Sequence, residues 1–321
     1  MYLDLLEPVK LGESVQWVRV RSAAPGNPLL LLIQQGPGLP MINEIGEFGR
    51  LLRLEAHFTV VYWDQRGCGL SLRAADGTRA TLQAMARDTQ QLLEVLSERF
   101  GPATVVGFSL GGAVAALAAA NRPDLVEILV AVAPDVDGPA AESFAYDFAL
   151  DMARRRRDRK AIRQLEAIGR PPHLTPQAFT TRVRWASNFG GVRAGRSYNS
   201  MARSLVWSLL RSADYSLPDV VRTLRAVPTT QAALLAELAT LDLARRVPRL
   251  ERPVFMIQGR HDRVAPASAL EQYAEVLEAP RKTLVWFEHS RHMPHFEEPE
   301  KFRRVLLQAR SLVGADRCPS E

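Results

Sequence analysis

The 321-residue chain has almost no cysteine and no long apolar segment. Its only cysteines are Cys68 and Cys318, which excludes a disulfide framework or a cysteine-rich metal site and favours a reducing compartment. The apolar run at residues 29–33 is far too short to span a bilayer, and the first residues lack the basic start and apolar stretch of a secretion signal. We therefore expect a cytoplasmic protein that does not enter a membrane.

Lysine is also scarce, although the chain is basic. The net charge is +6 and the pI about 9.7, yet only four lysines occur, so arginine supplies nearly all the positive charge. A basic pI invites a nucleic-acid partner, but no recognisable nucleic-acid module accompanies it. We interpret the excess as compositional bias and expect no nucleic-acid partner.

Short apolar runs alternate with helical patterns through the first half of the chain. This alternation is typical of a mostly parallel, doubly wound α/β sheet. The expected strands lie at 15–20, 29–33, 58–63, 104–106, 128–133, 253–257 and 283–287, and the expected helices at 42–54, 81–100, 113–120 and 299–312.

The alternation stops between residues 138 and 249. This stretch is helical in pattern, polar and rich in arginine, including the run Arg154–Arg157, most of which we expect to face solvent. We expect a core made of residues 1–137 and 250–321, with residues 138–249 inserted as a helical cap over the carboxyl edge of the sheet. Open α/β folds bind their ligands at that edge.

A Gly-Phe-Ser-Leu-Gly segment stands where an apolar strand meets an alanine-rich helix. This strand–turn–helix pattern resembles the nucleophile elbow of α/β-hydrolases. Ser109 would sit in a sharp turn that exposes its hydroxyl, and Gly107 and Gly111 would let the strand and helix approach closely. A glycine-rich turn with an incidental serine is the alternative interpretation.

A serine nucleophile needs a base and an orienting carboxylate, and in this fold they follow the late strands. Asp262 follows the strand at 253–257, and His292 follows the strand at 283–287. Asp135 or Asp137 is a rival for the carboxylate. We expect the other two histidines of the loop, His289 and His295, to lie at the surface or to support the site.

The oxyanion hole should combine two backbone N–H groups. One belongs to Leu110, at the start of the helix after the nucleophile. The other belongs to Gly36, in the Gln34-Gln35-Gly36-Pro37-Gly38 loop after the first central strand, although an ordinary tight turn would have the same composition. This chemistry needs no metal and no organic cofactor, so we expect none.

Four segments together resemble the proline iminopeptidase branch of the α/β-hydrolases. They are Asp-Gln-Arg-Gly-Cys-Gly-Leu-Ser at 64–71, Gly-Phe-Ser-Leu-Gly-Gly at 107–112, Gly-Arg-His-Asp at 259–262, and Ser-Arg-His-Met-Pro at 290–294 with Glu298, Pro299 and Phe302. The segment at 64–71 is the most specific. The resemblance implies a serine peptidase that removes an N-terminal residue from small peptides.

Two features depart from that branch. The branch has His-Gly-Gly-Pro-Gly before the oxyanion donor, whereas here Gln34 and Gln35 add bulk and polar groups at the mouth of the site. We place Gln34, Gln35 and Phe108 in the substrate pocket. The branch also holds the substrate amine with acidic residues on its cap, for which Glu142, Asp147, Asp151 and Glu166 are the candidates in an arginine-rich region.

The sequence therefore predicts a serine hydrolase with three functional alternatives. The first is iminopeptidase-like cleavage of short peptides, and the second is esterase, lactonase or thioesterase activity on a small molecule. The third is a lyase or other tailoring enzyme that uses the same residues without hydrolysis. A catalytically silent binding protein is a further alternative. The oligomeric state is not predicted.

Overall fold

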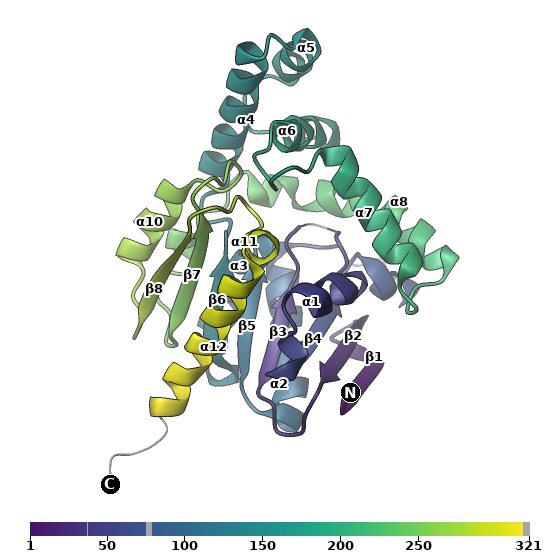
Figure 1. The fold of residues 1–321 in the computed structure, drawn as a ribbon, viewed down its shortest axis with the longest axis vertical. Coiled ribbons are helices and arrows are strands. Elements are labelled where there is room, and N and C mark those ends of the chain that lie inside the picture. Colours follow the sequence, from purple (N-terminus) through teal and green to yellow (C-terminus); the bar gives the residue numbers. More distant parts are fainter. Residues whose placement is uncertain (37, 75–78, 317–321) are drawn as a thin grey trace.

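An eight-stranded sheet forms the centre of the molecule (Figure 1). The computed structural model describes residues 1–36, 38–74 and 79–316, and Cys318 lies outside them. The strand order is β1-β2-β4-β3-β5-β6-β7-β8. The strands are β1 (Leu3–Leu11), β2 (Ser14–Ser22), β3 (Leu29–Ile33), β4 (Thr59–Asp64), β5 (Ala103–Phe108), β6 (Val126–Val132), β7 (Val254–Gly259) and β8 (Lys282–Phe287).

Six of these strands, β4-β3-β5-β6-β7-β8, run parallel, while β1 and β2 add an antiparallel edge. The central strand β3 reads Leu-Leu-Leu-Leu-Ile and is buried along its whole length, because helices cover both faces of a parallel sheet. The alternate residues Leu29, Leu31 and Ile33 pack into one core cluster, and Leu30 and Leu32 into the other. This confirms the predicted α/β-hydrolase class of fold.

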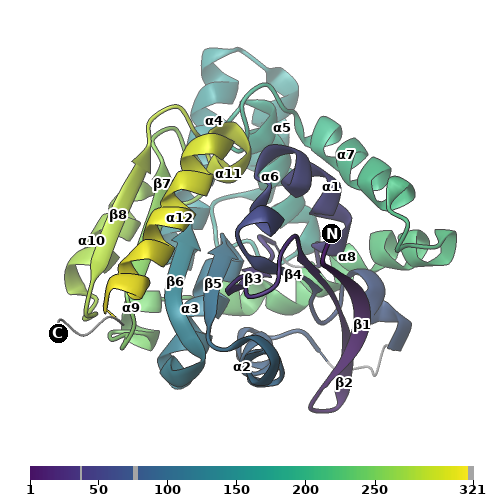
Figure 2. The same cartoon turned by 60° about the horizontal axis from the view of Figure 1, so that its bottom comes forward.

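The helices of the core lie in two layers (Figure 2). Apolar side chains of α2 (Leu82–Phe100), α3 (Leu110–Asn121) and α10 (Ala267–Val276) pack against one face. Those of α1 (Ile45–Leu51) and α12 (Pro299–Asp316) pack against the other. Short 3₁₀ turns supplement them: η1 (Ile42–Glu44), η2 (Leu54–Ala56), η3 (Gly69–Ala74) and η4 (Pro123–Leu125).

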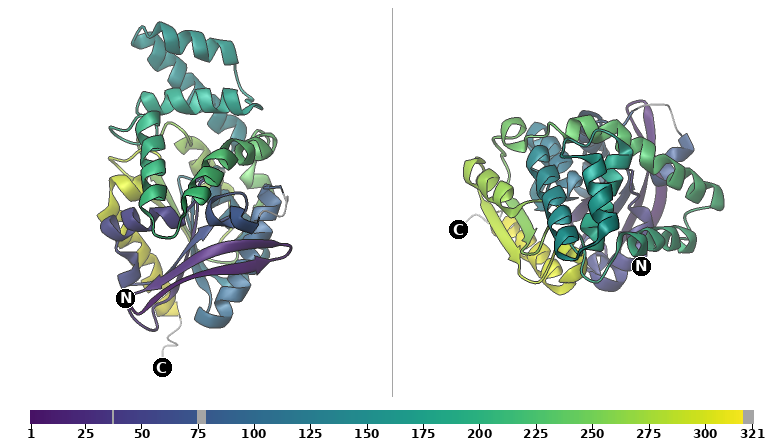
Figure 3. Two further views of the ribbon diagram at one scale, coloured as in Figure 1. Left: turned by 90° about the vertical axis from the view of Figure 1, so that its right-hand side faces the viewer. Right: turned by 90° about the horizontal axis from the view of Figure 1, so that it is seen from above.

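Six helices occupy the chain between β6 and β7. They are α4 (Gly138–Arg155), α5 (Arg159–Ile168), α6 (Pro176–Asn188), α7 (Tyr198–Arg211), α8 (Leu217–Leu238) and α9 (Leu243–Arg246). Helices α4 to α8 stand above the carboxyl ends of the parallel strands, with α5 farthest from the sheet (Figure 3). This stretch lies entirely within the described residues and is helical in the structure, with no strand of the sheet between β6 and β7.

The sequence analysis missed β1. Its nine residues are only half buried, and Pro8 interrupts their pattern, as an edge strand allows because one side of its backbone needs no partner. In the part of the chain that the structure describes, no helix combines the length and apolar character needed to cross a bilayer.

Candidate active site

Ser109 stands in the turn between β5 and α3 with a strained backbone. Its φ of 51° and ψ of −119° are rare for a residue with a side chain. The turn can form because two glycines remove obstacles. A Cβ on Gly107 would lie 2.2 Å from the carbonyl oxygen of Gly111, and one on Gly111 would lie 2.3 Å from that of Gln34. The elbow therefore packs directly against the loop that follows β3.

The structure brings together the three residues that the sequence singled out. His292 Nε2 lies 3.0 Å from Ser109 Oγ, and His292 Nδ1 lies 2.8 Å from Asp262 Oδ2. All three side chains come from loops at the carboxyl ends of strands. Ser109 is 9% exposed, His292 8% and Asp262 4%, so bulk water is largely excluded from the three groups.

The Asp262 carboxylate is fixed by three donors besides His292. The backbone N–H groups of Val264 and Ala265 donate to Oδ1 at 2.7 and 3.1 Å. The side-chain amide of Gln258 donates to Oδ2 at 3.0 Å. These bonds hold the carboxylate in one orientation, which in turn sets the orientation of the His292 ring.

The electrostatic surroundings of His292 favour its charged form. Burial lowers the pKa of this imidazole, but the charge of Asp262 and its hydrogen bond outweigh burial and raise the pKa above its usual value. The charges of Asp135 and Glu297 add to the rise. A buried histidine stabilised as a cation is suited to take a proton from a hydroxyl.

Two backbone N–H groups are available for an oxyanion near Ser109. Leu110 begins α3, so its N–H has no acceptor within the helix. Gly36 lies in the loop after β3, which contacts the elbow through Gly111. Gln34 is 3% exposed, and its Oε1 lies 3.5 Å from the thiol of Cys68, while its Nε2 has no hydrogen-bond partner. Gln35 is half-buried.

Phe108 and His295 share an aromatic cluster in the core. Phe108 belongs to β5, and its ring packs against Phe48, His295 and Phe302, with centroids 6.0, 4.4 and 6.1 Å away. His295 is 2% exposed in the same cluster, and burial holds the pKa of its ring well below the usual value. It is a core residue.

Asp135, the rival carboxylate, lies beside Ser109 rather than beside His292 Nδ1. Its backbone N–H donates to the carbonyl of Ser109 at 3.3 Å, and its carboxyl group also hydrogen-bonds with Ser109. Burial raises the pKa of this carboxyl to about 6, although the positive charges of His292 and Arg182 oppose the rise. A second titratable group besides His292 thus adjoins the Ser109 hydroxyl.

The segment at 64–71 organises the surroundings of the site. Asp64 is fully buried and accepts hydrogen bonds from the N–H groups of Met41, Ile42 and Leu70 at 2.8, 3.0 and 2.7 Å, and from the Tyr215 hydroxyl. It thereby joins the end of β4, the chain after the Gly36 loop and the cap segment. The most family-specific motif has a structural role here.

Of the four carboxylates that the sequence analysis singled out between residues 138 and 249, three are engaged at the surface. Asp147, Asp151 and Glu166 form exposed ion pairs with Arg170, Arg155 and Arg154. Glu142 is the exception, since its side chain is 7% exposed. It forms an ion pair with Arg182, at 2.7 Å between Oε1 and Nη1. Nothing in the sequence distinguishes Arg182 from the other arginines of this region.

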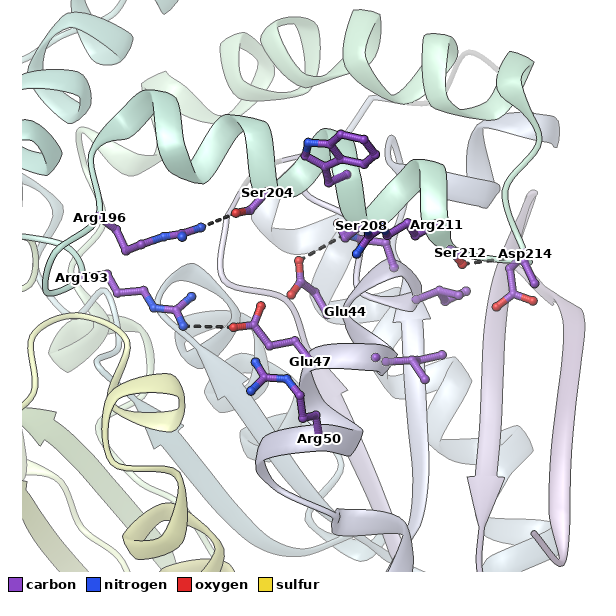
Figure 4. Close-up of a pocket in the computed structure, with 16 residues that line it drawn as sticks. Glu44, Glu47, Arg50, Arg193, Arg196, Ser204, Ser208, Arg211, Ser212 and Asp214 are labelled. Atoms are coloured by element: carbon purple, nitrogen blue, oxygen red, sulfur yellow. Dashed lines mark hydrogen bonds and ion pairs between the residues drawn. The ribbon is translucent and has the colours of Figure 1, made fainter.

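An open cleft of about 880 Å³ lies between α1 and α7 (Figure 4). Arg193 donates to Glu47 at 3.0 Å across it, and Arg196 donates to Ser204. Glu44 also lines it, and burial together with the charge of Glu47 raises the pKa of Glu44 to about 7. The residues that line this cleft do not include Ser109, His292 or Asp262, so it is separate from the triad.

Residues 28–299 match the family model described as alpha/beta hydrolase fold. The chain belongs to this family.

Relatives of this chain carry the names of both peptidases and esterases. The chain is 29% identical to the probable aminopeptidase YbaC of Bacillus subtilis (strain 168). The similarity extends over 313 residues, which is 95% of each chain. It is 30% identical to the pimeloyl-[acyl-carrier protein] methyl ester esterase of Vibrio vulnificus (strain CMCP6), covering 85% of this chain and 94% of that one. Among solved structures, proline iminopeptidase of Mycobacterium smegmatis superposes with a TM-score of 0.69 at 21% identity, over 97% of this chain and all of that one. The predicted resemblance to the iminopeptidase branch is thus confirmed.

Proposed function

We propose that this protein is a serine hydrolase that cleaves an amide or ester bond of a small substrate through an acyl-enzyme. The observation that carries the proposal is the continuous chain of contacts from Ser109 Oγ through His292 to Asp262, at 3.0 and 2.8 Å. Such a chain activates a hydroxyl that would otherwise be a weak nucleophile.

In the proposed mechanism, Ser109 Oγ attacks the substrate carbonyl while His292 Nε2 takes its proton. The N–H groups of Gly36 and Leu110 stabilise the oxyanion, and His292 then gives the proton to the leaving group. Asp262 holds the ring and stabilises the imidazolium. Water, deprotonated by His292, releases the acyl group. The helical segment 138–249 acts as a cap that limits access of solvent.

For the substrate, aminopeptidase activity on short peptides is the first candidate. It is supported by the relative named as a probable aminopeptidase, whose similarity extends over nearly the whole chain. A half-buried carboxylate beside Ser109, that of Asp135, could attract the ammonium group of an N-terminal residue. Asp135 would then do what acidic cap residues do in the iminopeptidase branch.

Ester hydrolysis is the second candidate, and a specific observation favours it. Glu142, the one deeply buried cap carboxylate among those considered above, is neutralised by Arg182. The cap therefore offers a substrate ammonium little negative charge. The relative from Vibrio vulnificus is named as an esterase.

Two assays on the same preparation test the proposal. We expect a fluorophosphonate probe to label wild-type protein at Ser109 and not the Ser109→Ala variant. Release of p-nitroaniline from prolyl p-nitroanilide, compared with release of p-nitrophenol from short acyl esters, distinguishes the two substrate classes. Hydrolysis at an unchanged rate in Ser109→Ala would refute the acyl-enzyme.

A further inference from the structure

Arg182 is a deeply buried cation on the cap. It lies on α6 and is 5% exposed. Its charged surroundings are Glu142 on α4, His173, which precedes α6, and Asp135 at the end of β6. Burial lowers the pKa of the guanidinium, and the two carboxylates partly restore it. Because arginine keeps its proton at any ordinary pH, the guanidinium remains a cation beside these two carboxylates.

The guanidinium has fewer acceptors than it has N–H groups. Its Nη1 forms an ion pair with Glu142 Oε1 at 2.7 Å, and its Nε has no hydrogen-bond partner. The other oxygen of Glu142 is engaged by the N–H of His173 at 3.2 Å. The ring of Phe179 lies 5.3 Å from the Arg182 Cζ and offers no strong acceptor. Buried donors without acceptors are costly, and neither Nε nor Nη1 has a hydrogen-bond acceptor in the described part of the chain, so a ligand oxygen that reached them would satisfy them.

The Arg182 guanidinium lies near the carboxyl edge of the sheet. Helix α4 begins at Gly138, after the residues 133–137 that follow β6, and Glu142 lies about 6 Å along the helix axis from that start. Arg182 pairs with Glu142, in the second turn of α4. The charge of Arg182 also acts on the carboxyl of Asp135, the residue that hydrogen-bonds with Ser109. In the proposed mechanism His292 gives the leaving group its proton.

We propose that Arg182 binds a carboxylate carried by the acyl part of the substrate. The inference deepens the proposed function and rests on it for the position of the acyl group. A guanidinium presents two parallel N–H groups that match the two oxygens of a carboxylate, and in a buried site such a contact selects strongly against a neutral group. In this proposal Glu142 holds the guanidinium in place through Nη1, and the Nε–H group of Arg182 binds the carboxylate of the substrate.

A matched pair of esters tests this assignment. Mono-p-nitrophenyl adipate and p-nitrophenyl hexanoate have the same chain length and leaving group, and differ in a terminal carboxylate. We expect wild-type protein to prefer the adipate ester in kcat/KM. In the double variant Arg182→Met/Glu142→Met, which removes both charges and leaves neither one buried alone, the ratio of the two kcat/KM values should fall about 10- to 100-fold.

Two further variants sharpen the result. Arg182→Lys keeps the positive charge but loses the pair of parallel N–H groups. Its ratio of kcat/KM for the adipate ester to kcat/KM for the hexanoate ester should therefore lie between those of wild type and the double variant. Arg154→Met removes a cap arginine whose side chain is 61% exposed and should leave the ratio unchanged. The assignment would be overturned if wild-type protein showed no preference for the adipate ester. It would also be overturned if the folded double variant kept that preference.

A binding measurement separates this inference from the proposed chemistry. We expect adipate dianion to raise the melting temperature of Ser109→Ala protein, and to fail to do so in Ser109→Ala combined with the double variant. If neither ester is hydrolysed and Ser109 is not labelled, the acyl-enzyme is refuted, yet the adipate shift still tests Arg182. Equal shifts with and without Arg182 would refute carboxylate binding even in an active hydrolase.

Discussion

At the residue scale, the charge balance around His292 determines how the candidate site responds to pH. Burial lowers the pKa of the ring, whereas Asp262, Asp135 and Glu297 raise it, and the raising effects prevail. A base must be neutral to accept a proton, so activity should rise with pH through the pKa of His292. Each of these carboxylates therefore contributes to the position of the acidic limb of the pH–rate profile.

Replacing Asp135 by asparagine should move that limb to lower pH. The substitution removes a negative charge that stabilises the imidazolium, so the pKa of His292 falls and the base is neutral at lower pH. The profile of kcat/KM for a neutral ester, measured on wild type and Asp135→Asn, checks the direction. Asp147→Asn, at an exposed site on α4, is the control. An unmoved limb, or one displaced to higher pH, would contradict this electrostatic account.

Replacing Asp262 by asparagine distinguishes the triad carboxylate from its rival. The amide no longer stabilises the imidazolium and can hold the wrong tautomer of His292, which in a serine protease costs on the order of 10⁴-fold in kcat. We expect a loss of kcat of similar order here. The free energy of unfolding should change much less than the activation free energy does. Esterase kinetics on Asp262→Asn and Asp135→Asn provide the comparison. A larger loss in Asp135→Asn would assign the orienting role to Asp135.

At the element scale, Asp64 connects three segments that are distant in the sequence. Its oxygens accept hydrogen bonds from the start of η1, from η3 and from Tyr215, which lies between α7 and α8. A Cβ on Gly69 would lie 1.9 Å from Asp64 Oδ2, and Gly69 also has a φ of +52°, so glycine is needed there. These contacts give the segment at 64–71 a structural role.

The Asp64→Asn substitution should destabilise the protein by about 2–4 kcal/mol, because the new NH₂ group faces N–H donors and leaves buried donors unsatisfied. Urea unfolding at pH 7 measures the change, with Asp147→Asn as the surface control. We also expect a lower rate of Ser109 labelling, since the Gly36 loop leads directly into Met41. A variant as stable as wild type would show that these hydrogen bonds contribute little.

The sequence predicted most strands, and it singled out the three residues Ser109, Asp262 and His292 that the structure brings together, because both depend on local patterns. Apolar runs mark the buried strands, and the chain order of Ser109, Asp262 and His292 follows from their place after strands. The sequence did not reveal that the ring of Phe108, at the end of β5, packs into the core cluster. Arg182 could not be singled out, because only the packing of α4 against α6 determines which cap arginine is buried.

At the scale of the whole molecule, polar contacts fasten the cap segment to the core. Arg73 of η3 donates to both oxygens of Asp219 on α8, at 3.0 and 2.7 Å. Thr230, farther along α8, donates to the carbonyl of Gly67 at 2.8 Å. Both contacts end on the segment that surrounds Asp64. Substitutions at these contacts should therefore affect both the stability of the helical segment and the geometry around Ser109.

The Asp219 ion pair should make this stability depend on pH. The hydrogen bonds from Arg73, followed by those from Ser216, lower the pKa of Asp219 well below its usual value. A carboxyl with a depressed folded pKa stabilises the fold above its unfolded pKa of about 3.9, and that contribution is lost as the pH falls. Asp219→Asn should lower the free energy of unfolding at pH 7 by about 1–3 kcal/mol.

Urea unfolding of wild type and Asp219→Asn at pH 7, 5 and 3 tests the sign of this effect. The difference between the two proteins should be full at pH 7 and 5 and smaller at pH 3, because the unfolded wild-type carboxyl is then protonated while the asparagine does not titrate. If the difference stayed constant to pH 3, the loss would come from packing on α8 rather than from charge. Asp219 lies on α8 and Arg73 on η3. If the difference in the free energy of unfolding between the two proteins decreases at pH 3, the ion pair between these residues stabilises the contact of α8 with η3 in a pH-dependent way.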